Sequence, residues 1–159
     1  MARGARMFRR KPAESPDVFW REYEEKTNEK VLGQGLGCYI SGWEEFESRE
    51  WKNIWGLVIA SSGGFRFHNF PKQNRILSLS LDSSPGGSKD KTIFIPKEKI
   101  ISVKLYEETR WWIRIFKYAP PELVIKYLDA AGNEKQLLLE ADYRIHDVAE
   151  KLKEMQSSG

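Results

Sequence analysis

The chain has 159 residues, the usual size of one domain, with a formal net charge of +3 and 13% aromatic residues. No apolar run approaches the roughly 20 residues that span a bilayer, and the single cysteine, Cys38, excludes an intramolecular disulfide and a cysteine-rich zinc site. We therefore expect a cytoplasmic protein, free or peripheral at the inner face of the membrane, that needs no cofactor and no metal.

Residues 1–13 are predicted to be a basic, flexible arm. Residues 1–11 hold five basic residues and no acidic one, so the rest of the chain has a net charge of −2. An arm of this kind can bind an anionic membrane surface. Nucleic acid ranks below membrane as a partner, because no aromatic motif that reads bases accompanies the arm.

Residues 14–159 are predicted to form one domain that begins with a helix from Pro16 to Lys30. Ser15 can cap this helix, proline suits its first position, and Asp17 places a negative charge near the positive end of the helix dipole.

Short apolar segments between residues 33 and 140 predict a β-rich core. The glycine-rich stretch Gly33–Ile40 predicts a bulged first strand. Asn53–Ala60 and Phe65–Phe70, separated by two serines and two glycines, predict a hairpin. Further strands are predicted at Ile76–Leu81, Thr92–Ile95, Ile100–Tyr106, Arg110–Tyr118, Leu123–Leu128 and Glu134–Glu140.

A final amphipathic helix is predicted over residues 142–156. Asp142 can cap it, and the apolar residues that follow recur at the spacing of one helical face. The residues of this face, which we expect to be buried, are Ile145, Val148, Ala149 and Leu152.

Three stretches carry a resemblance to a known superfold. They are a glycine-containing hairpin from Trp55 to Phe67, the segment Ile95–Val103 with its I-P-x-x-x-I-x-x-V pattern, and a last hairpin plus helix from Leu123 to Met155. In these features the chain resembles the pleckstrin-homology-like superfold, in particular its bacterial pleckstrin-homology and GRAM-type branches.

The resemblance covers about residues 33–156 and implies an α+β, mainly β, fold. A curled antiparallel sheet or open barrel would be capped by the C-terminal helix, with the N-terminal helix as an addition. For function, the resemblance implies a non-catalytic binding or adaptor module that recognises a protein segment or an acidic lipid surface.

The titratable and nucleophilic residues of the sequence favour a binding protein rather than an enzyme. His68 and His146 are the available imidazole bases, and neither has a motif around it that supplies a nucleophile; a pair of Cys38 and His68 also lacks one. Gly33, Gly35 and Gly37 do not match a dinucleotide fingerprint, because Cys38 occupies the position of its third glycine.

The segment Arg110–Tyr118 is the most unusual in the chain, since both faces of the predicted strand would carry bulky side chains. One interpretation is a strand packed in the core on one side and against the N-terminal helix, through Phe19 or Trp20, on the other. The alternative is a basic, aromatic surface for acidic lipid headgroups or a peptide. The ligand-binding residues would then be Arg110, Trp111, Trp112, Arg114 and Lys117.

A second hypothesis is a cyclic di-GMP sensor of the PilZ kind. Asp82, Ser84 and Gly87 fit the D-x-S-x-x-G half of the PilZ motif. Arg6 and Arg10 have the spacing of its R-x-x-x-R half, in which guanidinium groups hold phosphates, but they lie more than seventy residues upstream. A flexible turn is the simpler interpretation of this serine-rich and glycine-rich stretch.

Overall fold

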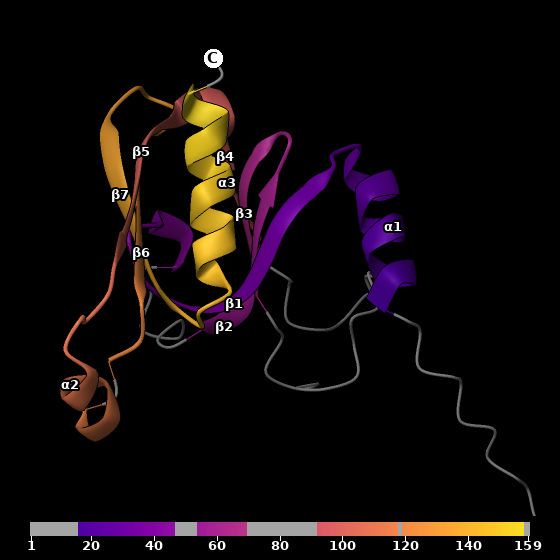
Figure 1. The fold of residues 1–159 in the computed structure, drawn as a ribbon. Coiled ribbons are helices and arrows are strands. Elements are labelled where there is room, and N and C mark those ends of the chain that lie inside the picture. The colour runs from indigo at the N-terminus through magenta and orange to yellow at the C-terminus, as the bar shows by residue number, and fades with distance from the viewer. Residues whose placement is uncertain (1–15, 47–53, 70–91, 118, 158–159) are drawn as a thin grey trace, which may run out of the picture.

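The computed structural model describes residues 16–46, 54–69, 92–117 and 119–157, which form an antiparallel sheet with a helix on each face (Figure 1). The predicted α+β, mainly β, class is confirmed. The strands are β1 (Val31–Ser41), β2 (Ile54–Ser61), β3 (Gly64–Asn69), β4 (Thr92–Pro96), β5 (Ile100–Tyr106), β6 (Glu122–Leu128) and β7 (Glu134–Ala141). The helices are α1 (Pro16–Thr27), α2 (Trp111–Phe116) and α3 (Ile145–Ser157), with 3-10 turns η1 (Glu44–Phe46) and η3 (Lys97–Lys99).

The sheet is curled but open. Its strand order is β4-β3-β2-β1-β7-β6-β5, with antiparallel neighbours throughout. The edge strands β4 and β5 are consecutive in the chain and joined only by η3, so the sheet must curl until its two edges approach at Pro96 and Ile100. Within the described residues, β4 and β5 do not pair with each other. α3 packs inside the curl against β1, β2 and β5 (Figure 1).

Alternation along the strands decides which side chains enter the core. On β2, Val58 and Ala60 point inward and are fully buried, while Ile59 points to the outer face, where α1 covers it. α3 completes the inner core through Ile145 and Leu152, which are both fully buried. The predicted burial of one face of the C-terminal helix is therefore confirmed.

The start of α3 is organised by Asp142. Its side-chain Oδ1 accepts a hydrogen bond from the backbone N–H of Arg144 at 3.1 Å, and its carbonyl accepts the N–H of Ile145, also at 3.1 Å. A capping side chain binds a backbone N–H two or three residues ahead in this way. The predicted cap is therefore present, and the regular helix begins three residues after it.

The glycines of β1 let α3 approach the sheet closely. A Cβ at Gly33 would meet Asp147 Oδ2 at 3.0 Å and the Val148 Cα at 3.3 Å, and one at Gly35 would lie 3.5 Å from Arg144 Cβ. The register with β2 also shifts between Val31 and Gly33, so the predicted bulged first strand is confirmed. These glycines serve helix packing, a role that their spacing in the sequence does not indicate.

α1 covers the outer face of β2 through Phe19 and Tyr23, which contact Ile59. The helix ends at Thr27, three residues before the predicted end, because Asn28 adopts a left-handed conformation with φ of +53° that turns the chain toward β1.

The predicted strand Arg110–Tyr118 is wrong, because its central residues form the helix α2. β5 and β6 are antiparallel neighbours, paired as far as Tyr106 and Glu122, so the chain between them is a connection with no adjacent strand to pair with. Local hydrogen bonds replace the ladder, and the backbone N–H of Lys117 donates to the carbonyl of Ile113 at 2.7 Å. The expected packing of this segment against Phe19 or Trp20 is also wrong, because α2 and α1 lie on opposite sides of the molecule (Figure 1) and the described residues packed around Phe19 come from α1, β1 and β2.

Several predictions lie outside the described residues. They are the basic arm 1–13, the strand Ile76–Leu81 and the loop that contains Asp82, Ser84 and Gly87. Among the helices in the described ranges, none has the length and apolar composition needed to cross a bilayer.

Candidate functional site

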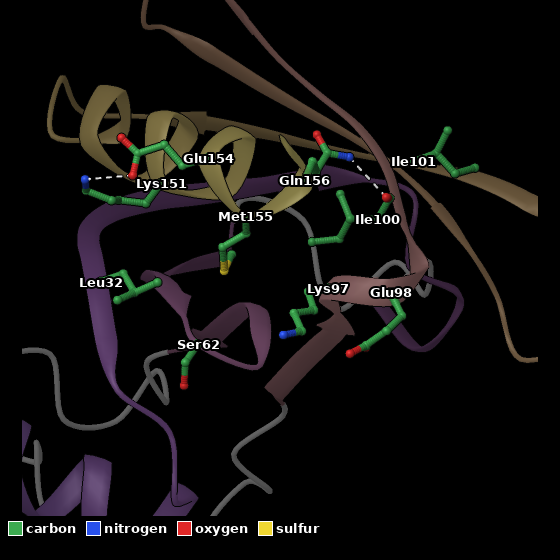
Figure 2. A pocket seen from close by; sticks show the side chains of 10 residues that line it. All are labelled: Leu32, Ser62, Lys97, Glu98, Ile100, Ile101, Lys151, Glu154, Met155 and Gln156. Carbon is green, nitrogen blue, oxygen red and sulfur yellow. Dashed lines mark hydrogen bonds and ion pairs between the residues drawn. The ribbon is translucent and has the colours of Figure 1, made fainter. Parts of the chain in front are cut away.

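A cleft of about 780 Å³ opens where the last turns of α3 face the beginning of β5 (Figure 2). We call it the α3–β5 cleft. It is lined by residues from α3, η3, β5, the first part of β1 and the β2–β3 turn, namely Leu32, Ser62, Lys97, Glu98, Ile100, Ile101, Lys151, Glu154, Met155 and Gln156.

The floor of the cleft is apolar and continuous with the core. Ile100 belongs to the inner core and is 8% exposed, and the partly buried Met155 packs against that core. Figure 2 shows Met155 and Leu32 directed toward the open space between α3 and β1. A side chain that enters the cleft would therefore reach an apolar surface.

The rim carries charges of both signs. Lys151 Nζ lies 2.9 Å from Glu154 Oε2, and this hydrogen bond raises the pKa of Lys151. Lys97 is exposed and points into the opening in Figure 2. Within the described ranges, Lys97 has no acidic side chain at ion-pair distance, so its charge is available to an incoming group.

Hydrogen bonds hold the walls of the cleft in place. The side-chain Nε2 of Gln156 donates to the carbonyl of Ile100 at 3.0 Å, which ties the end of α3 to the start of β5. Across the cleft, the backbone N–H of Ser62 donates to the carbonyl of Lys30 at 2.8 Å, and Ser62 Oγ accepts the N–H of Lys30 at 3.0 Å. The walls are therefore fixed to the sheet before any ligand binds.

β5 forms one wall and is an edge strand. It pairs with β6 on one side, and in the described part of the chain no strand pairs with its other side. The register with β6 shifts between Ile100 and Ser102, which places a bulge at Ile101 beside the cleft. An edge strand offers backbone N–H and C=O groups to a further strand.

A second cleft of about 560 Å³ lies between η1, β4 and the β6–β7 turn. The rings of Trp43 and Tyr127 are 5.6 Å apart in its wall. The hydroxyl of Tyr127 donates to the carbonyl of Gly42 at 2.9 Å, and the N–H of Trp43 donates to the hydroxyl of Tyr39 at 2.9 Å. These hydrogen bonds hold Trp43 and Tyr127 in place in the wall of the second cleft.

The titratable residues considered as catalytic groups lie apart. His68 Nδ1 is 2.9 Å from Thr92 Oγ1 on the outside of the sheet, whereas His146 Nε2 is 2.6 Å from Glu107 Oε1 at the start of α3. Cys38 is buried, and burial raises the pKa of its thiol, with a smaller contribution from Glu140. Within the described ranges, no group of three or more His, Cys, Asp or Glu residues is arranged to hold a metal ion.

The predicted ligand-binding residues of the 110–118 segment lie on or beside α2. Trp112 is 47% exposed, and Arg110 and Lys117 at the two ends of the helix are exposed as well. The guanidinium of Arg110 is ion-paired with Glu108 at 2.9 Å and lies 5.7 Å from the ring of Trp112. Trp111 and Arg114 belong to α2 by their backbone, and the positions of their side chains are not described.

Phe116 is not among the predicted ligand-binding residues, yet its side chain is 81% exposed on α2. In the predicted strand, Phe116 and Trp112 would share a face because alternate residues point the same way. In the helix they also share a face, because residues four apart lie on the same side.

The predicted cyclic di-GMP residues are not brought together by the described structure. Arg6, Arg10, Asp82, Ser84 and Gly87 all lie outside the described residues.

Comparison of the sequence with models of known protein families gives no match, and comparison with curated protein sequences gives none either.

Proposed function

We propose that this chain is a non-catalytic binding module of the pleckstrin-homology-like kind, which holds an extended protein segment in the α3–β5 cleft. The antiparallel strand order, the curl of the sheet and the packing of the last helix against its inner face support the resemblance. The observation that carries the function is the position of an apolar-floored cleft beside the edge of β5 that no strand among the described residues pairs with.

An extended peptide fits this position because it can use both features at once. Its backbone would add to the free edge of β5 beyond Ile100, whose carbonyl is already bound by Gln156. Alternate side chains of an added strand point the same way, so one apolar side chain would enter the cleft between Leu32 and Met155. Backbone hydrogen bonds would supply affinity, and the cleft would supply specificity.

The charge on the rim defines the chemistry of the preferred segment. Lys97 presents an available cation at the opening, whereas Lys151 is engaged by Glu154. An acidic side chain next to the apolar one in the peptide would therefore pair with Lys97. The class of ligand is an extended segment that combines one apolar anchor with a neighbouring carboxylate.

The test is to pan a library of short random peptides on the full chain and to titrate the enriched peptides by fluorescence anisotropy. We expect enriched peptides to carry an apolar residue beside an acidic one. Lys97→Glu is expected to weaken their binding by up to about fivefold, because an exposed ion pair contributes up to about 1 kcal/mol. The matched control is Lys153→Glu, which makes the same charge change at an exposed position of α3 outside the cleft.

A second measurement tests the edge-strand geometry. N-methylation of alternate peptide amides should abolish binding in one set of positions and leave the other set unaffected, since alternate residues of an added strand face its partner strand. Peptides that bind equally well to the Lys97→Glu protein and tolerate N-methylation everywhere would contradict the proposal, and so would a library that yields no enriched peptide.

A further inference from the structure

We propose that α2 is an anchor for anionic membrane surfaces, which inserts Trp112 and Phe116 into the interface of the bilayer. This inference goes beyond the proposed function, because it concerns a different part of the molecule and a different class of partner. It rests on the exposure of two aromatic rings, on the charge around them and on the place of α2 in the fold.

The aromatic rings of α2 are unusually exposed for residues of their size. Phe116 is 81% exposed and Trp112 is 47% exposed. The two residues are four apart in a helix, so their side chains lie on the same side. Large apolar side chains that remain in water on one side of a short helix are typical of a contact surface rather than of the core.

The charge of the segment matches an anionic surface. Between Thr109 and Lys117 the sequence holds three basic residues and no acidic one. Two acidic residues precede this segment: Glu108 is paired with Arg110, so these two charges offset each other, and Glu107 lies 2.6 Å from the imidazole of His146. Lys117 is exposed at the end of α2, and among the described residues it has no acidic partner at ion-pair distance. Basic residues near the surface of an anionic bilayer are attracted to it.

The place of α2 in the fold makes the rings accessible to a flat surface. Figure 1 shows α2 at the tip of the β5–β6 connection, projecting away from the sheet and from both long helices. Tyr106, which ends β5 and leads into this connection, is 52% exposed. Aromatic residues at such a tip can enter the headgroup region, as aromatic belts do in membrane proteins.

A lipid surface fits these features better than a protein partner. A stable protein interface buries about 800 Å² on each side, which is more than the face of a six-residue helix offers. A bilayer needs no complementary shape, because lipids rearrange around an inserted ring.

The first experiment is co-sedimentation of the full chain with phosphatidylcholine vesicles, alone or with phosphatidylserine added. We expect binding to the vesicles that contain phosphatidylserine and about tenfold weaker partitioning of the Trp112→Ala, Phe116→Ala double variant. The matched control is Trp55→Ala, because Trp55 is also 47% exposed but lies on β2. Circular dichroism of each variant checks that the fold is retained.

The second experiment places the ring in the bilayer directly. Lipids brominated in the acyl chains should quench part of the tryptophan fluorescence of the wild-type chain, and this part should disappear in Trp112→Phe, which keeps an aromatic ring and the binding. Equal sedimentation of the wild-type chain and the double variant would overturn the proposal. Quenching that is unchanged in Trp112→Phe would overturn it too, since the ring of Trp112 would then lie outside the bilayer.

Discussion

The Glu29 carboxylate joins the end of α1 to the outer face of the sheet. It accepts hydrogen bonds from Arg66 Nη2 at 2.6 Å and from Arg66 Nε at 3.0 Å, and the hydroxyl of Ser61 donates to it at 2.5 Å. The side chains of Glu29 and Arg66 are only 14% and 17% exposed, and the Arg66 Cζ lies 3.8 Å from the centre of the Phe94 ring. This pair is therefore bidentate and shielded from water, unlike the exposed ion pairs elsewhere on the surface.

The Glu29 pair predicts an acid-sensitive contribution to stability. The hydrogen bond from Arg66 lowers the pKa of Glu29 below its ordinary value of 4.5, against the opposing effect of burial. A lowered folded-state pKa means that the stabilisation is fully present above pH 4.5 and is lost as the pH falls through the lower, folded-state pKa. Glu29→Gln should reduce the free energy of unfolding at neutral pH by about 2 kcal/mol.

Urea unfolding of the wild-type chain and Glu29→Gln at a series of pH values measures this contribution. The difference in the free energy of unfolding between the two proteins should shrink as the pH falls below 4.5, because the Glu29 carboxylate of the wild-type chain then becomes protonated. Glu25→Gln, at an exposed position of α1, is the matched control and should leave stability nearly unchanged. A difference that stays constant with pH would contradict an ionic role for Glu29.

At the scale of elements, α3 is the part on which the inner core depends. Its side chain Leu152 is fully buried near the apolar floor of the α3–β5 cleft. Leu152→Ala should lower the free energy of unfolding by about 2–5 kcal/mol, the usual cost of removing a buried leucine side chain and leaving a cavity. Leu36→Ala is the control, because Leu36 on β1 is 42% exposed. Thermal unfolding followed by circular dichroism compares the stability of the two variants. Equal losses of stability in Leu152→Ala and Leu36→Ala would show that the inner core does not depend on α3.

The elements that the sequence predicted well are those whose neighbours are close in the chain. The hairpin of β2 and β3 and the hairpin of β6 and β7 each combine apolar alternation with a short turn, so local patterns suffice. α2 could not be predicted in this way. Its aromatic and branched residues favour a strand, and only the pairing of Tyr106 with Glu122 shows that a strand there would lack a partner.

At the scale of the whole molecule, the α3–β5 cleft could not be predicted, because its walls come from distant segments. Leu32 lies near the start of the domain and Met155 near its end. The sequence indicated one of the contributing segments, since the pattern from Ile95 to Val103 marks the turn η3 between two strands. It gave no indication that the last turns of α3 would face that turn, because this depends on how far the sheet curls.

The two proposed binding surfaces lie at opposite ends of β5. The strand has seven residues, which corresponds to about 20 Å at roughly 3.3 Å per residue. It begins at the cleft with Ile100 and ends at Tyr106, just before the connection that carries α2. Among the described side chains, none that lines the cleft belongs to α2. Sites that are this far apart and share no partners contribute independently to free energy.

Peptide and membrane should therefore bind without affecting each other. The affinity for a peptide selected on the α3–β5 cleft, measured by fluorescence anisotropy, should agree within about twofold in the presence and absence of vesicles with phosphatidylserine. The Trp112→Ala, Phe116→Ala double variant, which should remain off the vesicles, serves as the reference for peptide binding in the same mixture. A change larger than about fivefold, or about 1 kcal/mol, would mean that β5 transmits a rearrangement between its ends. Gln156 holds the first residue of β5, and Glu107, which follows its last residue, contacts His146, so α3 fixes both ends of the strand and we expect no such rearrangement.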